Sequence, residues 1–176
     1  MQGLGGALIG ASLIGALMTF GDWVWARFTL PHRAVFGLAH GLVLCCGIGL
    51  HLGLPRKAVA RGALAGGAIG LGASALFYVL APLLKWGAMF PAWMAFWIAF
   101  GVLLWRHLGE PTASLAESVF RGAIAAVLSG LAFYSISGIW TAPSPDGPDY
   151  LRHFASWSFA FLPGFIALLA ERRRKR

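Results

Sequence analysis

Long runs of apolar residues, separated by short polar segments, divide the chain. Each run approaches the roughly 20 residues that an α-helix needs to cross a bilayer core. A backbone in lipid must satisfy its own hydrogen bonds, and the connections are short, so we expect helices. The pattern predicts an all-α integral membrane protein with six transmembrane helices, at about 4–26, 34–52, 59–84, 88–105, 118–140 and 153–170. These form one domain, 1–171, followed by a basic tail, 172–176.

The composition agrees with this pattern. Hydrophobic residues make up 59% of the chain and charged residues only 11%, whereas a water-soluble domain carries about a quarter charged residues. The net charge of +8 comes from basic residues at the edges of the apolar runs. That position suits orientation in a membrane and lipid contact, so we expect no nucleic-acid partner.

The basic residues are unequally divided between the two sides of the predicted membrane domain. The second and fourth connections and the tail carry ten of them, and the other connections carry four. The positive-inside rule then predicts that both termini are cytoplasmic. The abundance of Ala, Gly and Arg favours a bacterial inner membrane. The five cations of 172–176 are a topology anchor or a site for anionic lipid, and both interpretations remain open.

A short phrase occurs twice, as HLGLP at 51–55 and HLGEP at 107–111. Aligning 51–80 with 107–136 gives eight identities, and a further shift of 56 places the sequence GAL of 6–8 on 62–64. One period covers two membrane crossings, so the copies would be three parallel helical hairpins around a central cavity. Gly and Ala are so common in this chain that some matches are expected by chance.

The repeated phrase also predicts how two helices end. Its glycine would take the left-handed position after the last turn, and its proline would prevent the helix from continuing. Its histidine would lie in the last turn, near the carbonyl end of the helix dipole. A ligand-binding role for the two histidines is the alternative. The residues are His51, Gly53 and Pro55 in one copy and His107, Gly109 and Pro111 in the other.

Residues that could carry catalysis are scarce. GxSxG, HExxH, P-loop and CxxC motifs are all absent from the sequence. The six acidic residues lie at segment ends or in connections, whereas an ion-coupled transporter places an acid near the middle of the membrane. We therefore expect no enzyme, no cofactor and no metal site. Cys45 and Cys46 are interpreted as small packing residues.

The first and third apolar segments are rich in small residues, with glycines four apart that let helix backbones approach closely. This pattern predicts tight packing within the chain, with an oligomer interface or a wall beside a bound lipid as alternatives. The fourth segment carries an aromatic stripe at helical spacing, which is typical of a core or lipid-facing surface and less often of a ligand site. The glycines are Gly6, Gly10, Gly62, Gly66 and Gly70; the stripe is Phe90, Trp93, Phe96, Trp97 and Phe100.

Two motifs and the predicted topology resemble those of a known family. HLGLPRK at 51–57 is similar to the HLGEPHK of the insulin-induced gene (Insig) proteins, and PDYLRHFASW at 148–157 to their PDFLYIRSW, with one extra residue. The resemblance implies a six-helix, non-enzymatic protein that binds a lipid between its helices, a sterol in animals and a diacylglycerol-type lipid in bacterial relatives. The matched positions are Asp149, Tyr150, Ser156 and Trp157, and His51, Gly53 and Pro55, which more often serve the structure than the ligand.

The favoured hypothesis is an Insig-like protein that binds a diacylglycerol- or sterol-type lipid and has a sensing or regulatory role. An apolar cavity with few polar groups is the usual form of such a site. A small transporter or facilitator for a neutral solute or lipid, and an accessory subunit of a larger membrane complex, are the alternatives; a homo-oligomer is also left open. The head group would lie near Asp22, His40 or Trp157, and the apolar part along Gly66, Gly70, Phe77, Trp97 and Tyr134.

Overall fold

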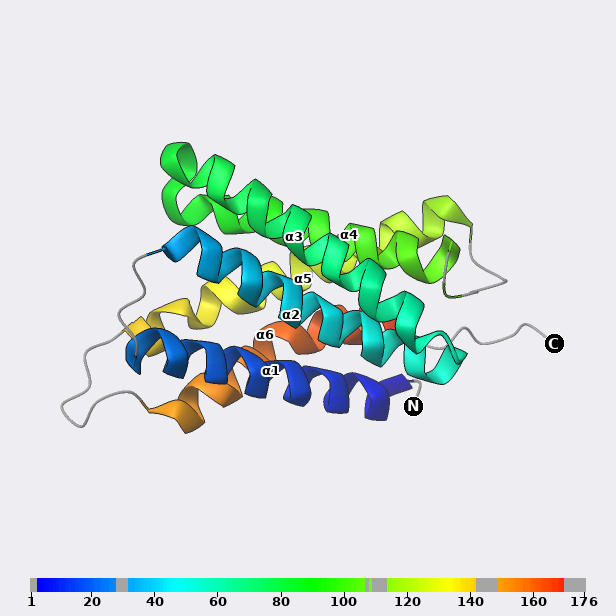
Figure 1. Cartoon of the computed structure of the whole chain (residues 1–176). Helices are drawn as coiled ribbons and strands as arrows, with labels where there is room; N and C mark the ends of the chain where they lie inside the picture. The colour runs from blue at the N-terminus through cyan, green and yellow to red at the C-terminus, as the bar shows by residue number, and fades with distance from the viewer. Residues whose placement is uncertain (1–2, 28–31, 107, 109–113, 142–148, 170–176) are drawn as a thin grey trace.

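Each apolar run of the sequence is an α-helix in the computed structural model (Figure 1). The structure describes residues 3–27, 32–106, 108, 114–141 and 149–169. The expected all-α fold is confirmed, and the helix ends lie within three residues of the expected ones. The helices are α1 Gly3–Arg27, α2 Arg33–Gly53, α3 Val59–Leu84, α4 Met89–Arg106, α5 Leu115–Thr141 and α6 Tyr150–Leu169, with short 3₁₀ turns η1 Leu54–Arg56 and η2 Lys85–Ala88.

Five of these helices, α1 to α5, are long and apolar enough to cross a membrane by length and composition. The helix α6 is not among them, since its first half carries Arg152, His153 and two serines. The structure therefore agrees with an integral membrane protein.

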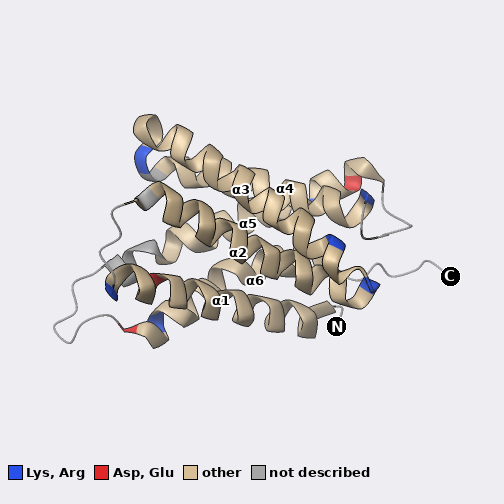
Figure 2. Ribbon diagram, in the orientation of Figure 1, with Lys and Arg blue, Asp and Glu red and all other residues tan. Residues whose placement is uncertain are grey.

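The helices run alternately in opposite directions along one bundle (Figure 1). We call the end where α1 begins and α6 finishes the N-terminal end, and the other the opposite end. Among the described residues, Lys, Arg, Asp and Glu lie toward the two ends of the bundle and not in its middle (Figure 2). The helix boundaries place Arg56, Lys57, Arg61, Arg106 and Arg121 at the N-terminal end, and Arg27, Lys85 and Arg152 at the opposite end.

The helices are paired unevenly. The most extensive contact joins α2 to α3; α6 packs on both α1 and α5, and α5 also packs on α4, while α1 and α2 touch little although they are consecutive. Backbones meet directly in the α2–α3 pair: a Cβ on Gly62 would collide with the Gly49 carbonyl oxygen, and one on Gly66 with that of Cys45. Gly62 and Gly66 of α3 thus pack within the chain.

Aromatic side chains fill the space among α4, α5 and α6. Trp97 and Phe100 of α4, Phe133 of α5, and Phe161 and Phe165 of α6 are fully buried. The Trp97 ring occupies the position that a Cβ on Gly164 would take. The aromatic stripe of α4 is therefore core along most of its length.

The end of α2 differs from the expectation. Gly53 is not left-handed but helical, with φ −78° and ψ −27°, and the chain continues through η1 to Lys57, which has φ 53°. Pro55 is tolerated because the first turn of a helix leaves backbone donors unused. A Cβ on Gly53 would lie 2.7 Å from the Ala58 carbonyl oxygen, so this glycine instead lets α3 begin close to α2. The second copy, with His107 and Gly109–Pro111, lies outside the described residues.

His51 lies in the last turn of α2, as expected, but its hydrogen bond goes to another helix. Its Nε2–H donates a hydrogen bond of 2.9 Å to the carbonyl oxygen of Gly6 in α1, and only 5% of the residue is exposed. Its ring meets that of Phe165 edge-on, at 5.5 Å between centroids. His51 therefore ties α2 to α1 rather than capping its own helix.

Candidate functional site

A cavity of about 210 Å³ lies between the α2–α3 pair and the other helices. It is smaller than the roughly 300–1,000 Å³ of typical ligand pockets, so it has room for one ring or short chain segment. Five helices contribute to its walls. The lining residues are Met18 of α1; Gly37, His40, Gly41, Leu44 and Cys45 of α2; Gly70, Ala73, Ser74, Phe77 and Tyr78 of α3; Met89, Ala92, Trp93 and Phe96 of α4; and Trp157 and Phe161 of α6.

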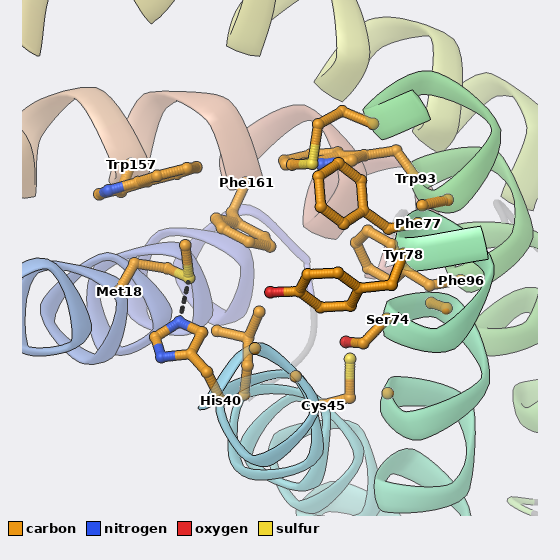
Figure 3. Close-up of a pocket in the computed structure, with 17 residues that line it drawn as sticks. Met18, His40, Cys45, Ser74, Phe77, Tyr78, Trp93, Phe96, Trp157 and Phe161 are labelled. Atoms are coloured by element: carbon orange, nitrogen blue, oxygen red, sulfur yellow. Dashed lines mark hydrogen bonds between the residues drawn. The ribbon is translucent and has the colours of Figure 1, made fainter. Parts of the chain in front are cut away.

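Glycines make room for the polar side chains that line the cavity. A Cβ on Gly41 would occupy the position of the Ser74 hydroxyl, and one on Gly37 that of the Tyr78 hydroxyl. These pairs connect α2 with α3. Because neither glycine carries a side chain, the two hydroxyl groups reach across to the wall formed by α2 (Figure 3).

His40 is the third polar group of the cavity. Its Nε2 lies 3.0 Å from the Met18 sulfur, a contact drawn in Figure 3. Gly21 of α1 leaves space for the imidazole, which a Cβ there would overlap. A thioether is a weak acceptor, so a ligand oxygen would be a better partner for the ring than Met18.

The rest of the lining is apolar and aromatic. Among the described residues, no Lys, Arg, Asp or Glu side chain forms part of it. An anionic phosphate would therefore find no counter-charge on these walls, whereas a neutral hydroxyl would find the groups of His40, Ser74 and Tyr78. The arrangement suits an apolar ligand with one small neutral polar end.

Asp22 lies beside the cavity and forms a polar cluster with α6. Its Oδ2 accepts a hydrogen bond of 2.7 Å from the Trp157 indole N–H and one of 3.0 Å from His153 Nδ1–H. The side chain of Asp22 is 32% exposed and that of His153 is 13% exposed. The carboxylate therefore meets two donors from α6 and is not part of the cavity lining.

The structure brings together half of the residues expected at the site. His40, Gly70, Phe77 and Trp157 line the cavity. Asp22 lies outside the lining and bonds to Trp157, which is part of it.

Three expected residues lie elsewhere. Gly66 packs against the α2 backbone at Cys45. Trp97 is fully buried against Gly164, and its indole N–H has no hydrogen-bond partner among the described residues. Tyr134 is 38% exposed and lies against Phe133, with 5.3 Å between ring centroids.

The sequence-based list missed several lining residues, above all Met18, Ser74, Tyr78 and Phe161. A weak signal existed for two of them. Ser74 and Tyr78 are four residues apart and so share a helix face, as do Gly37 and Gly41 opposite them. The match between the two pairs can be recognised only when the register in which α2 faces α3 is known.

Buried side chains lie in the interior of the N-terminal half of the bundle. There the His51–Gly6 hydrogen bond and the rings of Phe165 and Trp97 occupy the interior. Trp97 and Phe165 meet edge-on at 5.9 Å between centroids. The cavity therefore belongs to the half of the bundle nearer the opposite end.

Within the described part of the chain, no group of three or more His, Cys, Asp or Glu residues could hold a metal ion. Comparison with protein-family models, with curated proteins and with solved structures finds no match to this chain.

Proposed function

We propose that this protein binds a neutral membrane lipid, of the diacylglycerol or sterol type, in the cavity between the α2–α3 pair and the other helices. The observation that carries the proposal is the lining: an apolar wall from five helices with His40, Ser74 and Tyr78 as its polar groups. A neutral hydroxyl would bond to these groups while a ring or chain contacts the aromatic wall. The rest of the lipid would lie outside the cavity, because its volume is too small for a whole molecule.

The motifs at 51–57 and 148–157, similar to those of the Insig family, support a sensing or regulatory role. A protein of this kind needs no cofactor and catalyses no reaction; it changes state when the lipid binds. The uneven helix packing suits such a change, since the α2–α3 pair touches α1 and α4 less than its two members touch each other.

We also propose that all six helices cross the membrane as three related hairpins. A period of two helices makes α2–α3, α4–α5 and α6–α1 equivalent pairs, and all three are in extensive contact, although α5 contacts α6 as much as it contacts α4. A Cβ on Gly66 would collide with Cys45, and a Cβ on Gly101 would lie 3.4 Å from the Gly122 Cα. Gly101 and Gly122 are the positions of Cys45 and Gly66 shifted along the chain by 56 residues.

We propose that the protein lies in a bacterial inner membrane, with the N-terminal end of the bundle facing the cytoplasm. Arg56, Lys57, Arg61, Arg106 and Arg121 at that end support this choice. The tail 172–176, the proposed contact with anionic lipid, lies outside the described residues.

Filling the cavity tests the binding proposal. Ala73 lines the cavity, and Ala75 lies on the exposed side of the same helix. We expect native mass spectrometry of the wild type in mild detergent to show one neutral lipid at fixed stoichiometry. Ala73→Phe should remove it, and Ala75→Phe should retain it.

The result is interpretable only if both variants keep the helical content and melting temperature of the wild type. A mixture of bulk lipids, or equal retention by both variants, would exclude the cavity as the site. Transport of a neutral solute or lipid, or service as an accessory subunit, would then be the functions to test.

A further inference from the structure

Trp157 forms part of the cavity wall and at the same time bonds to a charged residue outside it. Its ring stacks on that of Phe133, at 5.4 Å between centroids and 27° between planes, and lies 6.3 Å from that of Phe161. Stacking fixes the plane of an indole but not which of its edges faces the ligand. That choice depends on the partner of the indole N–H.

Asp22 is that partner. Its carboxylate oxygen accepts the indole N–H at 2.7 Å, and Trp157 is only 6% exposed. In Figure 3 the nitrogen lies at the end of the Trp157 side chain that points away from the other labelled rings. Hydrogen bonds to charged acceptors are short and about twice as strong as neutral ones. The bond therefore turns the polar edge out of the cavity and leaves a carbon edge facing in.

The carboxylate is itself held from a second side. His153, one turn before Trp157 on α6, donates to the same oxygen at 3.0 Å. On α1 the preceding residue, Gly21, accommodates the ring of His40. Asp22 lies near the end of α1, and α1 already meets α6 closely at Gly15 and Ser158. Joining the two helices is thus not enough to explain Asp22.

We propose that Asp22 is a positioning residue for the binding site: its carboxylate fixes the Trp157 indole as a wall of the cavity and so sets the shape offered to the lipid. This rests on the proposed lipid-binding function. It replaces the expectation that Asp22 contacts the head group. Asp22 acts through Trp157 and touches no ligand.

The position of the indole is tested first, without any ligand. In ¹H–¹⁵N spectra of the ¹⁵N-labelled protein in detergent, the Trp157 indole signal is identified by its loss in Trp157→Phe. We expect Asp22→Ala to move this signal strongly upfield, because the charged acceptor is gone. Asp22→Asn should move it less, because the amide oxygen still accepts. Asp149→Asn removes the same charge from the exposed start of α6 and should leave the signal in place.

Binding is tested next, with radiolabelled 1,2-dioleoylglycerol as the probe. We expect Asp22→Ala to weaken its binding about tenfold, with Asp22→Asn in between, since loss of one bond to a charged group is of that order. Adding Asp22→Ala to Trp157→Phe should cost nothing further, because interacting residues are non-additive when one acts through the other. Additive losses would show instead that Asp22 acts separately from Trp157.

An indole signal unmoved by Asp22→Ala would overturn the positioning role. A moved signal with unchanged dioleoylglycerol binding would overturn the link between ring position and ligand. If the wild type binds neither this probe nor cholesterol, the proposed function fails, while the spectra still decide whether Asp22 holds the indole. Asp22→Asn keeps the test usable if Asp22→Ala does not fold.

Discussion

The α2–α3 pair and the aromatic core of α4 and α6 fill space in opposite ways. In the first, glycines bring two backbones together, with a Cβ on Gly62 excluded by the Gly49 carbonyl. In the second, rings such as Trp97 and Phe165 hold the helices at the distance of a side chain. Helices in contact through glycines lie closer together than helices in contact through aromatic rings, so the spacing between helices differs across the bundle. The cavity lies between these two regions.

The largest effect is expected from emptying the aromatic core. Trp97→Ala removes a fully buried indole that lies against Gly164 and Phe165. We expect a loss of about 3–5 kcal/mol in the free energy of unfolding, since the cavity left behind cannot collapse fully. Denaturant or thermal unfolding in detergent measures it.

Phe120→Ala is the control, because Phe120 is 65% exposed and should change stability little. Equal losses in the two variants would mean that the core is not held by its aromatic packing.

Overfilling the glycine contact should rank second. Gly66→Leu places a side chain against the α2 backbone at Cys45, where no flexible group can move aside. We expect a loss of about 3 kcal/mol or more in unfolding free energy, at the upper end of overpacking effects, and separation of α2 from α3. The melting temperature and helical content in detergent report it.

Gly72→Leu makes the same change on the same helix at a position with open space around it. It should leave the melting temperature almost unchanged. If both variants melt alike, the close approach of α2 and α3 is not what stabilises this pair.

The smallest effect is expected at the junction between the two regions. His51→Phe keeps an aromatic ring against Phe165 but loses the hydrogen bond to the Gly6 carbonyl. We expect a loss of about 1–2 kcal/mol in unfolding free energy, as for one buried hydrogen bond. Faster hydrogen exchange in the first turns of α1 should accompany it.

His32→Phe at the exposed start of α2 is the matched substitution and should change neither quantity. A destabilisation by His32→Phe as large as that by His51→Phe would assign the effect to the added apolar surface rather than to the lost bond.

The sequence predicted the helices well because the length and hydropathy of each run determine them. It could not say which face of each helix meets which neighbour. Trp97 and Trp157 have the same chemistry, yet one lies sealed in the core and the other lines the cavity. That difference depends on Gly164, which admits the Trp97 ring, and on Asp22, which bonds Trp157 from a helix more than 130 residues away along the chain.

Local rules failed for a related reason at the end of α2. Gly53 and His51 fit the expected pattern for a helix end, but α1 and α3 offered them tertiary partners. As a result, Gly53 is helical and Lys57 is the residue that adopts the left-handed conformation.

The buried side chains of the N-terminal half have a consequence for how the protein would sample its surroundings. If the proposed binding holds, His51, Phe165 and Trp97 occupy the interior on one side of the site, so a bound lipid would exchange with the leaflet around the other half of the bundle. The two leaflets of a membrane differ in composition and change independently. The occupancy of this site would follow the lipid content of one leaflet alone, and would respond when a lipid is moved from one leaflet to the other even though its total amount is constant.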